Sequence, residues 1–287
     1  MAADDPRDLS RLSVLAVFAH PDDEGFGCGG TLAMLVARGA RVTLVCATNG
    51  DVGEISDPAL ATPESLAQVR QQELRRAMEV TGVQDVRFLG YRDSGMAGTA
   101  DNDHPRSFFQ APPEEVVGRL VDVIREVQPE VVITSDPSGG YGHPDHTAVY
   151  DRTTLAFSAA GDAESRGNHE DGPEPWSPRL LYYVCFPRSN FRRLWQQMLD
   201  ADITPPFASL DIDSLGSPDE DVTTVLDVSA TVDIKIESLN CHRTQIDPNG
   251  PFAKLPEDMM REIMSTEYFT LAVAPKDQGN ADLLGSL

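Results

Sequence analysis

Two clusters of histidine and carboxylate side chains each follow an apolar segment of the chain. His20-Pro-Asp-Asp-Glu24 comes directly after the apolar residues 12–19, and His143-Pro-Asp-His146 comes shortly after the apolar residues 131–134. A divalent cation with one open coordination position takes about three protein ligands of the imidazole and carboxylate type, and a further carboxylate can accept the proton of a bound water. The two clusters supply such a set and predict a metal-dependent hydrolase.

The first cluster contains a proline that stiffens the turn after the strand. Pro21 fixes its own φ and favours an extended conformation at His20, so the side chains of His20 and Asp23 can converge on one point. Asp22 then remains available as a carboxylate that binds no metal. The alternative is that Asp22 and Asp23 only cap the following helix, a common role of aspartate. The second cluster at another strand end favours the metal site.

The second cluster combines glycines with polar side chains in the segment Gly139-Gly-Tyr-Gly-His-Pro-Asp-His146. The glycines allow positive φ and a close approach of the backbone to a ligand. Tyr141, His143 and His146 offer a hydrogen-bond donor, an acid–base group and a metal ligand. Asp145 can hold one of the two histidines in a single tautomer. The alternative is a surface turn with helix-capping residues, but the crowding of polar groups at a strand end favours a site.

Short apolar segments alternate with amphipathic ones along the first half of the chain. The pattern predicts strands near 12–19, 41–47, 85–89 and 130–135, and helices at 29–39, 64–81, 113–127 and 144–159. This alternation is typical of βα units that build a mostly parallel sheet with helices on both faces. Ligands bind beyond the carboxyl ends of such strands, so we expect the two clusters to meet there.

A polar, turn-rich stretch at 161–175 follows this α/β core, which we expect to span residues 10–160. Beyond it the pattern predicts further elements: a strand at 180–186, helices at 189–200 and 229–243, and an acidic loop at 211–221. No repeat and no clear linker is present, so we expect one domain over residues 1–287. The expected fold class is α/β, a Rossmann-like, mostly parallel sheet flanked by helices, with residues 176–275 as a C-terminal covering segment.

The composition and net charge of the chain limit the classes of molecule that it can bind. The net charge of −23 at pH 7 argues against nucleic acid and against an anionic membrane, since both require a basic face. No apolar stretch approaches the roughly 20 residues of a membrane span, and the acidic first residues differ from a secretory signal. Four cysteines without CxxC spacing indicate reduced thiols. We expect a cytoplasmic protein that acts on a small molecule, with homo-oligomerisation left open.

The motifs resemble those of the PIG-L (LmbE-like) family of zinc-dependent N-acylglucosamine deacetylases. The resemblance rests on residues 20–24 and 140–146. Within the family, the chain is similar to the branch that contains the mycothiol-pathway deacetylase and the mycothiol S-conjugate amidase. Tyr91-Arg-Asp-Ser-Gly-Met-Ala-Gly98 and His242-Arg-Thr-Gln-Ile-Asp-Pro248 also resemble that branch. The resemblance covers roughly residues 12–270.

Carried over position by position, the resemblance implies a metal site and the residues beside it. The implied ligands of one Zn²⁺ per chain are His20, Asp23 and His146, with Fe²⁺ left open because this ligand type suits both metals. Asp22 is implied as the general base.

The remaining implied roles concern charge and substrate. The resemblance implies that His143, steadied by Asp145, supports the charge of the tetrahedral intermediate or protonates the leaving amine, and that Tyr141 binds the oxyanion. Substrate-binding roles are implied for Arg70 and Asp93, and His242 is a candidate from the covering segment. The residue patterns leave alternatives: a solvent-facing Arg70, an Asp93 bonded to its own turn, and a surface or capping His242.

The expected function is removal of an acyl group, with acetyl preferred, from the amino nitrogen of a glucosamine-type sugar. The alternative within the family is the S-conjugate amidase, which Thr244-Gln-Ile-Asp-Pro248 favours slightly. Gly27 disfavours it, because the resembling amidases carry a lysine near this position that binds the thiol conjugate. We expect residues 25–30 to line the space where the acyl group or the aglycone lies. A non-catalytic carbohydrate-binding or regulatory protein is disfavoured because every implied catalytic position holds a competent side chain.

Overall fold

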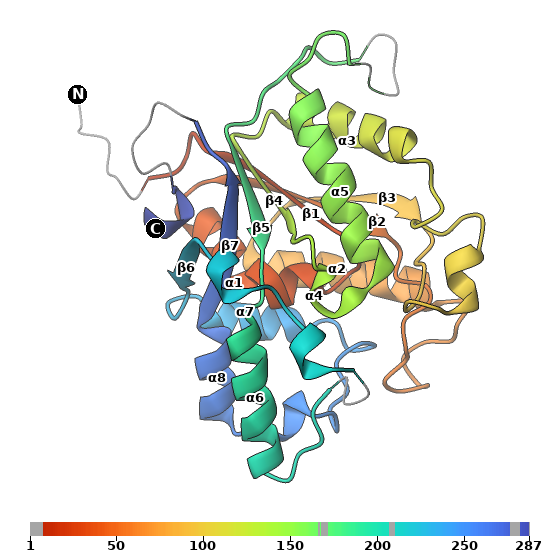
Figure 1. The fold of residues 1–287 in the computed structure, drawn as a ribbon, viewed down its shortest axis with the longest axis vertical. Coiled ribbons are helices and arrows are strands. Elements are labelled where there is room, and N and C mark those ends of the chain that lie inside the picture. Colours follow the sequence, from red (N-terminus) through yellow and green to blue (C-terminus); the bar gives the residue numbers. More distant parts are fainter. Residues whose placement is uncertain (1–7, 166, 168–171, 207–209, 276–281, 287) are drawn as a thin grey trace.

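The computed structural model describes residues 8–165, 167, 172–206, 210–275 and 282–286, which form a seven-stranded sheet between helices (Figure 1). The strand order is β3-β2-β1-β4-β5-β7-β6. The strands are β1 (Ser13–Phe18), β2 (Arg41–Thr48), β3 (Asp85–Tyr91), β4 (Val131–Ser135), β5 (Leu180–Val184), β6 (Thr224–Asp227) and β7 (Thr266–Val273). β1 to β5 are parallel, and β7 is antiparallel to both of its neighbours.

Helices cover both faces of the sheet (Figure 1). They are α1 (Asp23–Ala37), α2 (Leu66–Thr81), α3 (Pro113–Val127), the short α4 (Gly139–Gly142), α5 (Pro144–Ala159), α6 (Arg188–Asp200), α7 (Val232–Asn240) and α8 (Glu257–Met264). Because side chains alternate along a strand, Val14 packs into the core shared with α1 and α2, and Leu15 into the core shared with α3 and α5. A strand buried on both faces is apolar throughout, which explains the unbroken apolar run of β1.

The α/β fold expected from the sequence is confirmed. The helices expected at 113–127 and 144–159 coincide with α3 and α5, and α2 and α6 begin within two residues of their expected starts. The four strands expected in the first half correspond to β1 to β4. None of the helices in the described ranges combines the length and the apolarity that crossing a bilayer requires.

The first helix differs from the expectation. α1 begins at Asp23 rather than at residue 29, and its backbone leaves helical geometry at Cys28, where φ is −149°. Glycine has a low helix propensity, so the glycine-rich start does not look helical in sequence. Tight packing explains these glycines: a Cβ at Gly25 would lie 2.8 Å from Leu239 Cδ2, and one at Gly27 would lie 2.7 Å from Val184 Cγ1. Gly25 and Gly27 therefore pack against α7 and β5, so neither of these two positions has room for a side chain that lines a substrate space.

The C-terminal portion does more than cover the strand ends, because β7 and β6 extend the sheet beyond β5. The sequence pattern did not indicate these strands, nor α8. β7 alternates between part-exposed and buried positions over its first four residues and is more exposed beyond them, and β6 has only four residues. Neither strand therefore forms a continuous apolar run. Within the polar stretch expected at 161–175, residues 166 and 168–171 lie outside the described residues.

Candidate metal and catalytic site

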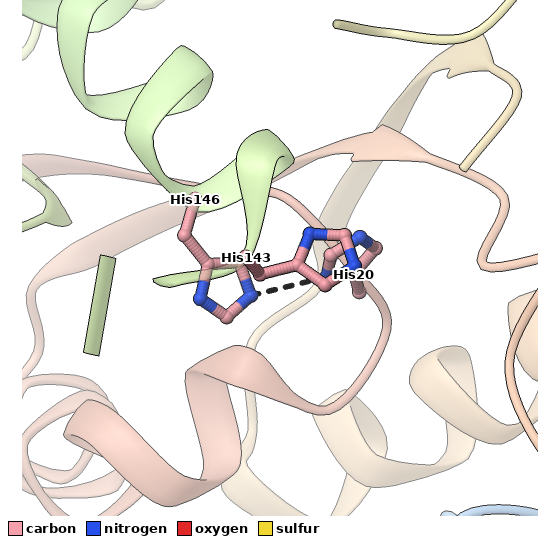
Figure 2. A group of neighbouring side chains, drawn as sticks. All are labelled: His20, His143 and His146. Atoms are coloured by element: carbon pink, nitrogen blue, oxygen red, sulfur yellow. Dashed lines mark hydrogen bonds between the residues drawn. The ribbon is translucent and has the colours of Figure 1, made fainter. Parts of the chain in front are cut away.

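The carboxyl ends of β1 and β4 bring the two motifs together. These strands are parallel neighbours; His20 follows β1, and His146 lies in the first turn of α5. His20 Nδ1 lies 3.1 Å from His146 Nε2 although 126 residues separate them. Figure 2 shows both rings beside His143, and each of the three offers a nitrogen within 4.8 Å of the others. The expectation that the two clusters meet at one edge of the sheet is confirmed.

Each of the rings of His20 and His146 has one nitrogen that points away from the other ring, and the contact of that nitrogen indicates the tautomer. His146 Nδ1 lies 3.1 Å from the carbonyl oxygen of Gly139, and His20 Nε2 lies 3.2 Å from Asp145 Oδ2. These nitrogens face acceptors and therefore carry the protons. When both rings are neutral, as they are in metal ligands, His20 Nδ1 and His146 Nε2 present lone pairs to each other at 3.1 Å. A cation bound between the two nitrogens would accept both lone pairs.

The Asp23 carboxylate lies against the same two nitrogens, with one oxygen toward each. Its Oδ1 lies 3.1 Å from His146 Nε2, and its Oδ2 lies 3.5 Å from His20 Nδ1. Ligand atoms about 2.0–2.1 Å from a tetrahedral zinc ion lie about 3.3 Å apart, so these separations match one coordination sphere. Two imidazoles and one carboxylate also leave a fourth position open for water or substrate. The residues present therefore fit a catalytic zinc ion, and the same donor set suits ferrous iron.

Asp145 lies against His20 and not, as expected, against the side chain of His143. Its carboxylate is fully buried and receives two hydrogen bonds from Ser94, from the backbone N–H at 2.9 Å and from the hydroxyl at 2.5 Å. A buried carboxylate held in this way fixes the orientation and the tautomer of the imidazole that it contacts. Ser94 was not singled out in the sequence, although it directly follows Asp93 in the segment that resembles the family.

His143 is held by the backbone. Its Nδ1 accepts the N–H of Asp145 at 3.1 Å, so it caps α5 and keeps its proton on Nε2. Burial lowers the pKa of His143 to about 3, and the neighbouring His20 and His146 act in the same direction. The ring is therefore neutral near pH 7 and presents Nε2–H as a hydrogen-bond donor. It can stabilise negative charge without being an imidazolium.

Asp93 forms the turn considered for it and also lies beside two imidazoles. Its Oδ1 accepts the backbone N–H of Gly95 at 2.8 Å, which forms the expected turn. The same oxygen lies 3.5 Å from His20 Nε2 and 3.8 Å from His143 Nε2. Burial raises the pKa of Asp93, but the charge and hydrogen bond of His20 outweigh it and leave the pKa well below its usual value. Asp93 is therefore an ionised carboxylate beside two imidazoles.

Asp22 adopts a backbone conformation that is rare outside glycine, with φ at +122° and ψ at −25°. Such strain costs of order 1–3 kcal/mol and is found at functional sites. Its side chain makes no capping hydrogen bond to α1, so capping does not explain this residue. Burial raises the pKa of Asp22 to about 6, while the Arg70 guanidinium opposes the shift. A bound cation would lower this pKa again and keep the carboxylate ready to accept a proton.

Arg70 is buried and does not face solvent, so that alternative is wrong. Its Nη1 donates to the carbonyl of Gly50 at 2.9 Å, and its Nη2 donates to the carbonyl of Pro21 at 2.7 Å and to Asp22 Oδ2 at 3.1 Å. The guanidinium therefore holds both the backbone and the carboxylate of the first motif.

Tyr141 lies on a sharply bent loop that contains three glycines with positive φ. Gly139, Gly140 and Gly142 have φ values of +64°, +69° and +82°. The ring of Tyr141 stands edge to face with His146, with centroids 5.1 Å apart. Burial and the charge of Asp23 raise the pKa of the Tyr141 hydroxyl well above its usual value, so it remains a protonated donor.

His242 is fully buried, which excludes the surface position considered for it. Its Nε2 lies 3.1 Å from Glu24 Oε1. Burial lowers the pKa of the ring, but Glu24, through its charge and its hydrogen bond, raises the pKa above the ordinary value of 6.5. His242 therefore contacts the first motif through Glu24.

Residues 15–157 match the family described as PIG-L, GlcNAc-PI de-N-acetylase. The chain is also similar over nearly its whole length to proteins named 1D-myo-inositol 2-acetamido-2-deoxy-alpha-D-glucopyranoside deacetylase. The relative from Geodermatophilus obscurus is 42% identical over 281 residues, covering 94% of each chain. The relative from Thermobifida fusca is 41% identical over 281 residues, covering 94% of this chain and 96% of its own.

Solved structures share the fold at lower identity. N,N'-diacetylchitobiose deacetylase from Pyrococcus horikoshii superposes with a TM-score of 0.64 at 22% identity, covering 90% of this chain and 83% of its own. A 4-carboxy-2-hydroxymuconate hydratase from Pseudomonas putida superposes with a TM-score of 0.58 at 18% identity, covering 93% and 99%. Because a deacetylase and a hydratase share this fold, the reaction must be argued from the site and from the full-length relatives.

Proposed function

The chain belongs to the PIG-L family, and on this premise we propose that it is a zinc-dependent deacetylase that removes the N-acetyl group of a glucosamine-type sugar. The observation that carries the proposal is the close approach of His20 Nδ1, His146 Nε2 and the Asp23 carboxylate. The neighbouring Asp22 carboxylate is held by Arg70. The names of the full-length relatives support a glucosaminide linked to inositol as the substrate class.

Zinc held by His20, Asp23 and His146 would polarise the amide carbonyl and lower the pKa of a water to about 7. Asp22 then accepts the proton of the attacking water and returns it to the nitrogen that leaves as the amine. His143 Nε2–H and the Tyr141 hydroxyl donate hydrogen bonds to the oxygen on which negative charge develops. Asp22 delivers one proton of the water to the leaving nitrogen, and the acetic acid that forms releases the other, so the products are acetate and the protonated amino sugar.

The environment of Gly27 favours a deacetylase over an S-conjugate amidase. A lysine here, as in the resembling amidases, has no room, because a Cβ would lie 2.7 Å from Val184 Cγ1 in the core. The protein therefore offers no cation at this position for a thiol conjugate. A non-catalytic sugar-binding role is disfavoured by Asp22, whose strained backbone has an evident use only as a base.

The test of the substrate class is amine release from three compounds, measured as kcat/KM. These are an N-acetylglucosaminyl inositol, a cysteinyl-conjugate amide of the same amine, and an N-acetyl amine without a sugar. We expect the first to be the best substrate, since a site that hydrogen-bonds sugar hydroxyls penalises analogues that lack them. Preference for the conjugate would indicate the amidase. Equal rates on the sugar-free amide would refute the proposed substrate class.

The test of the mechanism is Asp22→Asn. The asparagine keeps the shape of the side chain but cannot accept the proton, so kcat should fall by about 10²–10⁴. Zinc content should stay at one ion per chain, because Asp22 is not a ligand. Near-normal turnover would exclude Asp22 as the base.

A further inference from the structure

We infer that Glu24 and His242 are positioning residues that hold the base Asp22 in its strained backbone conformation. The inference rests on the proposed function, in which Asp22 accepts the proton of water. Neither residue has a role in the mechanism described above. Both are buried, with exposed fractions of 1% and 0%, and they come from opposite ends of the chain.

Glu24 bridges the base and the histidine. Its Oε2 accepts the backbone N–H of Asp22 at 3.1 Å, and its Oε1 lies 3.1 Å from His242 Nε2. The two contacts use both carboxylate oxygens, so the position of the Asp22 amide depends on where His242 lies. This amide belongs to the residue whose φ is +122°. A hydrogen bond to a carboxylate is among the stronger ones available to a backbone N–H, which makes it suited to holding a strained residue.

His242 is itself placed by contacts with α2. Two residues further along, Thr244 donates its backbone N–H and its hydroxyl to the two carboxylate oxygens of Glu73, at 2.9 Å and 2.6 Å. Glu73 is buried on α2. On the preceding side, α7 packs so closely on α1 that a Cβ at Gly25 would meet Leu239. The histidine therefore has little freedom to leave Glu24.

A second residue of α2 also fixes the position of Asp22. Arg70 lies one turn before Glu73 on α2 and donates to Asp22 Oδ2 at 3.1 Å and to the carbonyl of Pro21 at 2.7 Å. One face of α2 thus fixes the Asp22 carboxylate directly through Arg70, and fixes its backbone N–H through Thr244, His242 and Glu24. If the hydrogen bond from the Asp22 N–H to Glu24 is lost, the φ of Asp22 can relax and move the Asp22 carboxylate away from the attacking water.

The central variant is Glu24→Met, which keeps the volume and removes both hydrogen bonds. We expect kcat to fall by about 10- to 100-fold, since a misplacement of order 1 Å in a reacting group costs that much. KM should change by less than about threefold, and zinc should stay at one ion per chain. Glu24→Gln should recover most of the lost kcat, because the amide oxygen can still accept the Asp22 N–H while His242 adopts its other tautomer.

Two comparisons separate positioning from general damage. In an Asp22→Asn background, Glu24→Met should lower kcat by less than about twofold, because the group it positions no longer acts. The matched control is the double variant Lys235→Met and Glu267→Met, which removes another buried carboxylate that accepts backbone N–H groups of α1, together with its partner at 2.7 Å. Its kcat should stay within about twofold of wild type.

Three outcomes would overturn the inference: a Glu24→Met enzyme with kcat near wild type, an equal loss in the Asp22→Asn background, or loss of zinc from Glu24→Met. If Glu24→Met does not fold, His242→Gln serves in its place. The glutamine can still donate to Glu24, but its different shape shifts the Glu24 carboxylate. The kcat of His242→Gln should therefore fall without loss of zinc. Failure of the proposed function is distinguishable, because Asp22→Asn alone would then turn over normally.

Discussion

Replacing Ser94 by alanine isolates one buried hydrogen bond that acts on the metal site from outside the ligand set. The Ser94 hydroxyl donates to Asp145 Oδ1 at 2.5 Å and accepts the N–H of Phe109 at 2.9 Å, and neither Ser94 nor Asp145 is exposed to solvent. Asp145 in turn contacts His20 Nε2 at 3.2 Å. The substitution therefore loosens the carboxylate that orients a proposed zinc ligand, and it leaves every ligand in place.

The size of the effect follows from the contacts that remain. A hydrogen bond to a charged group contributes about 1.5–3 kcal/mol. At 1.4 kcal/mol for each factor of ten, this corresponds to roughly 10- to 150-fold in zinc affinity. The backbone N–H of Ser94 still donates to Asp145 Oδ2 at 2.9 Å, so the carboxylate is only partly released. We therefore expect zinc binding to weaken by about 10- to 50-fold, within the range found for groups that orient metal ligands.

The measurement is zinc affinity by competition with a chromophoric chelator at 25 °C, with circular dichroism to establish that the variant is folded. The control is Ser107→Ala in the same loop. Ser107 is equally buried, and its hydroxyl donates to the carbonyl of Asn102 at 3.4 Å, away from Asp145. Zinc affinity of the control should stay within about twofold. A Ser94→Ala protein that binds zinc as tightly as wild type, or an equal loss in the control, would show that Asp145 does not act through Ser94.

Three further predictions concern the ligand set, the oxyanion donor and the pH dependence of stability. His146→Ala should lose the metal, measured by elemental analysis, and a full complement of zinc would contradict the ligand assignment. Tyr141→Phe should keep its zinc and lower kcat by about 10²–10³; a much smaller loss would mean that the hydroxyl does not meet the oxyanion. Because Glu24 raises the pKa of His242 above 6.5, their contact stabilises the fold fully below pH 6.5 and less as pH rises through the folded-state pKa. The difference in unfolding free energy between wild type and His242→Gln, from urea titrations, should therefore shrink between pH 5.5 and 9, and a constant or growing difference would refute this reasoning.

Local sequence patterns were sufficient for much of the fold. The apolar runs at 12–19 and 131–134 predicted β1 and β4, and the polar motifs after them predicted where the two clusters meet. This succeeds because hydrophobic periodicity and strand-end chemistry are properties of neighbouring residues. β6 and β7 were not foreseen, because an antiparallel edge with mixed burial lacks a distinctive run.

The partners of the buried polar groups were decided only by the tertiary structure. Asp145 contacts His20 rather than its sequence neighbour His143, and Ser94 reaches it from 51 residues away. Glu24 and His242, 218 residues apart, meet because α7 packs on α1. A sequence motif indicates which groups are available at a strand end, since spacing along the backbone is short and regular. Which acceptor faces which donor depends on how separate elements pack, and that is set by the whole core.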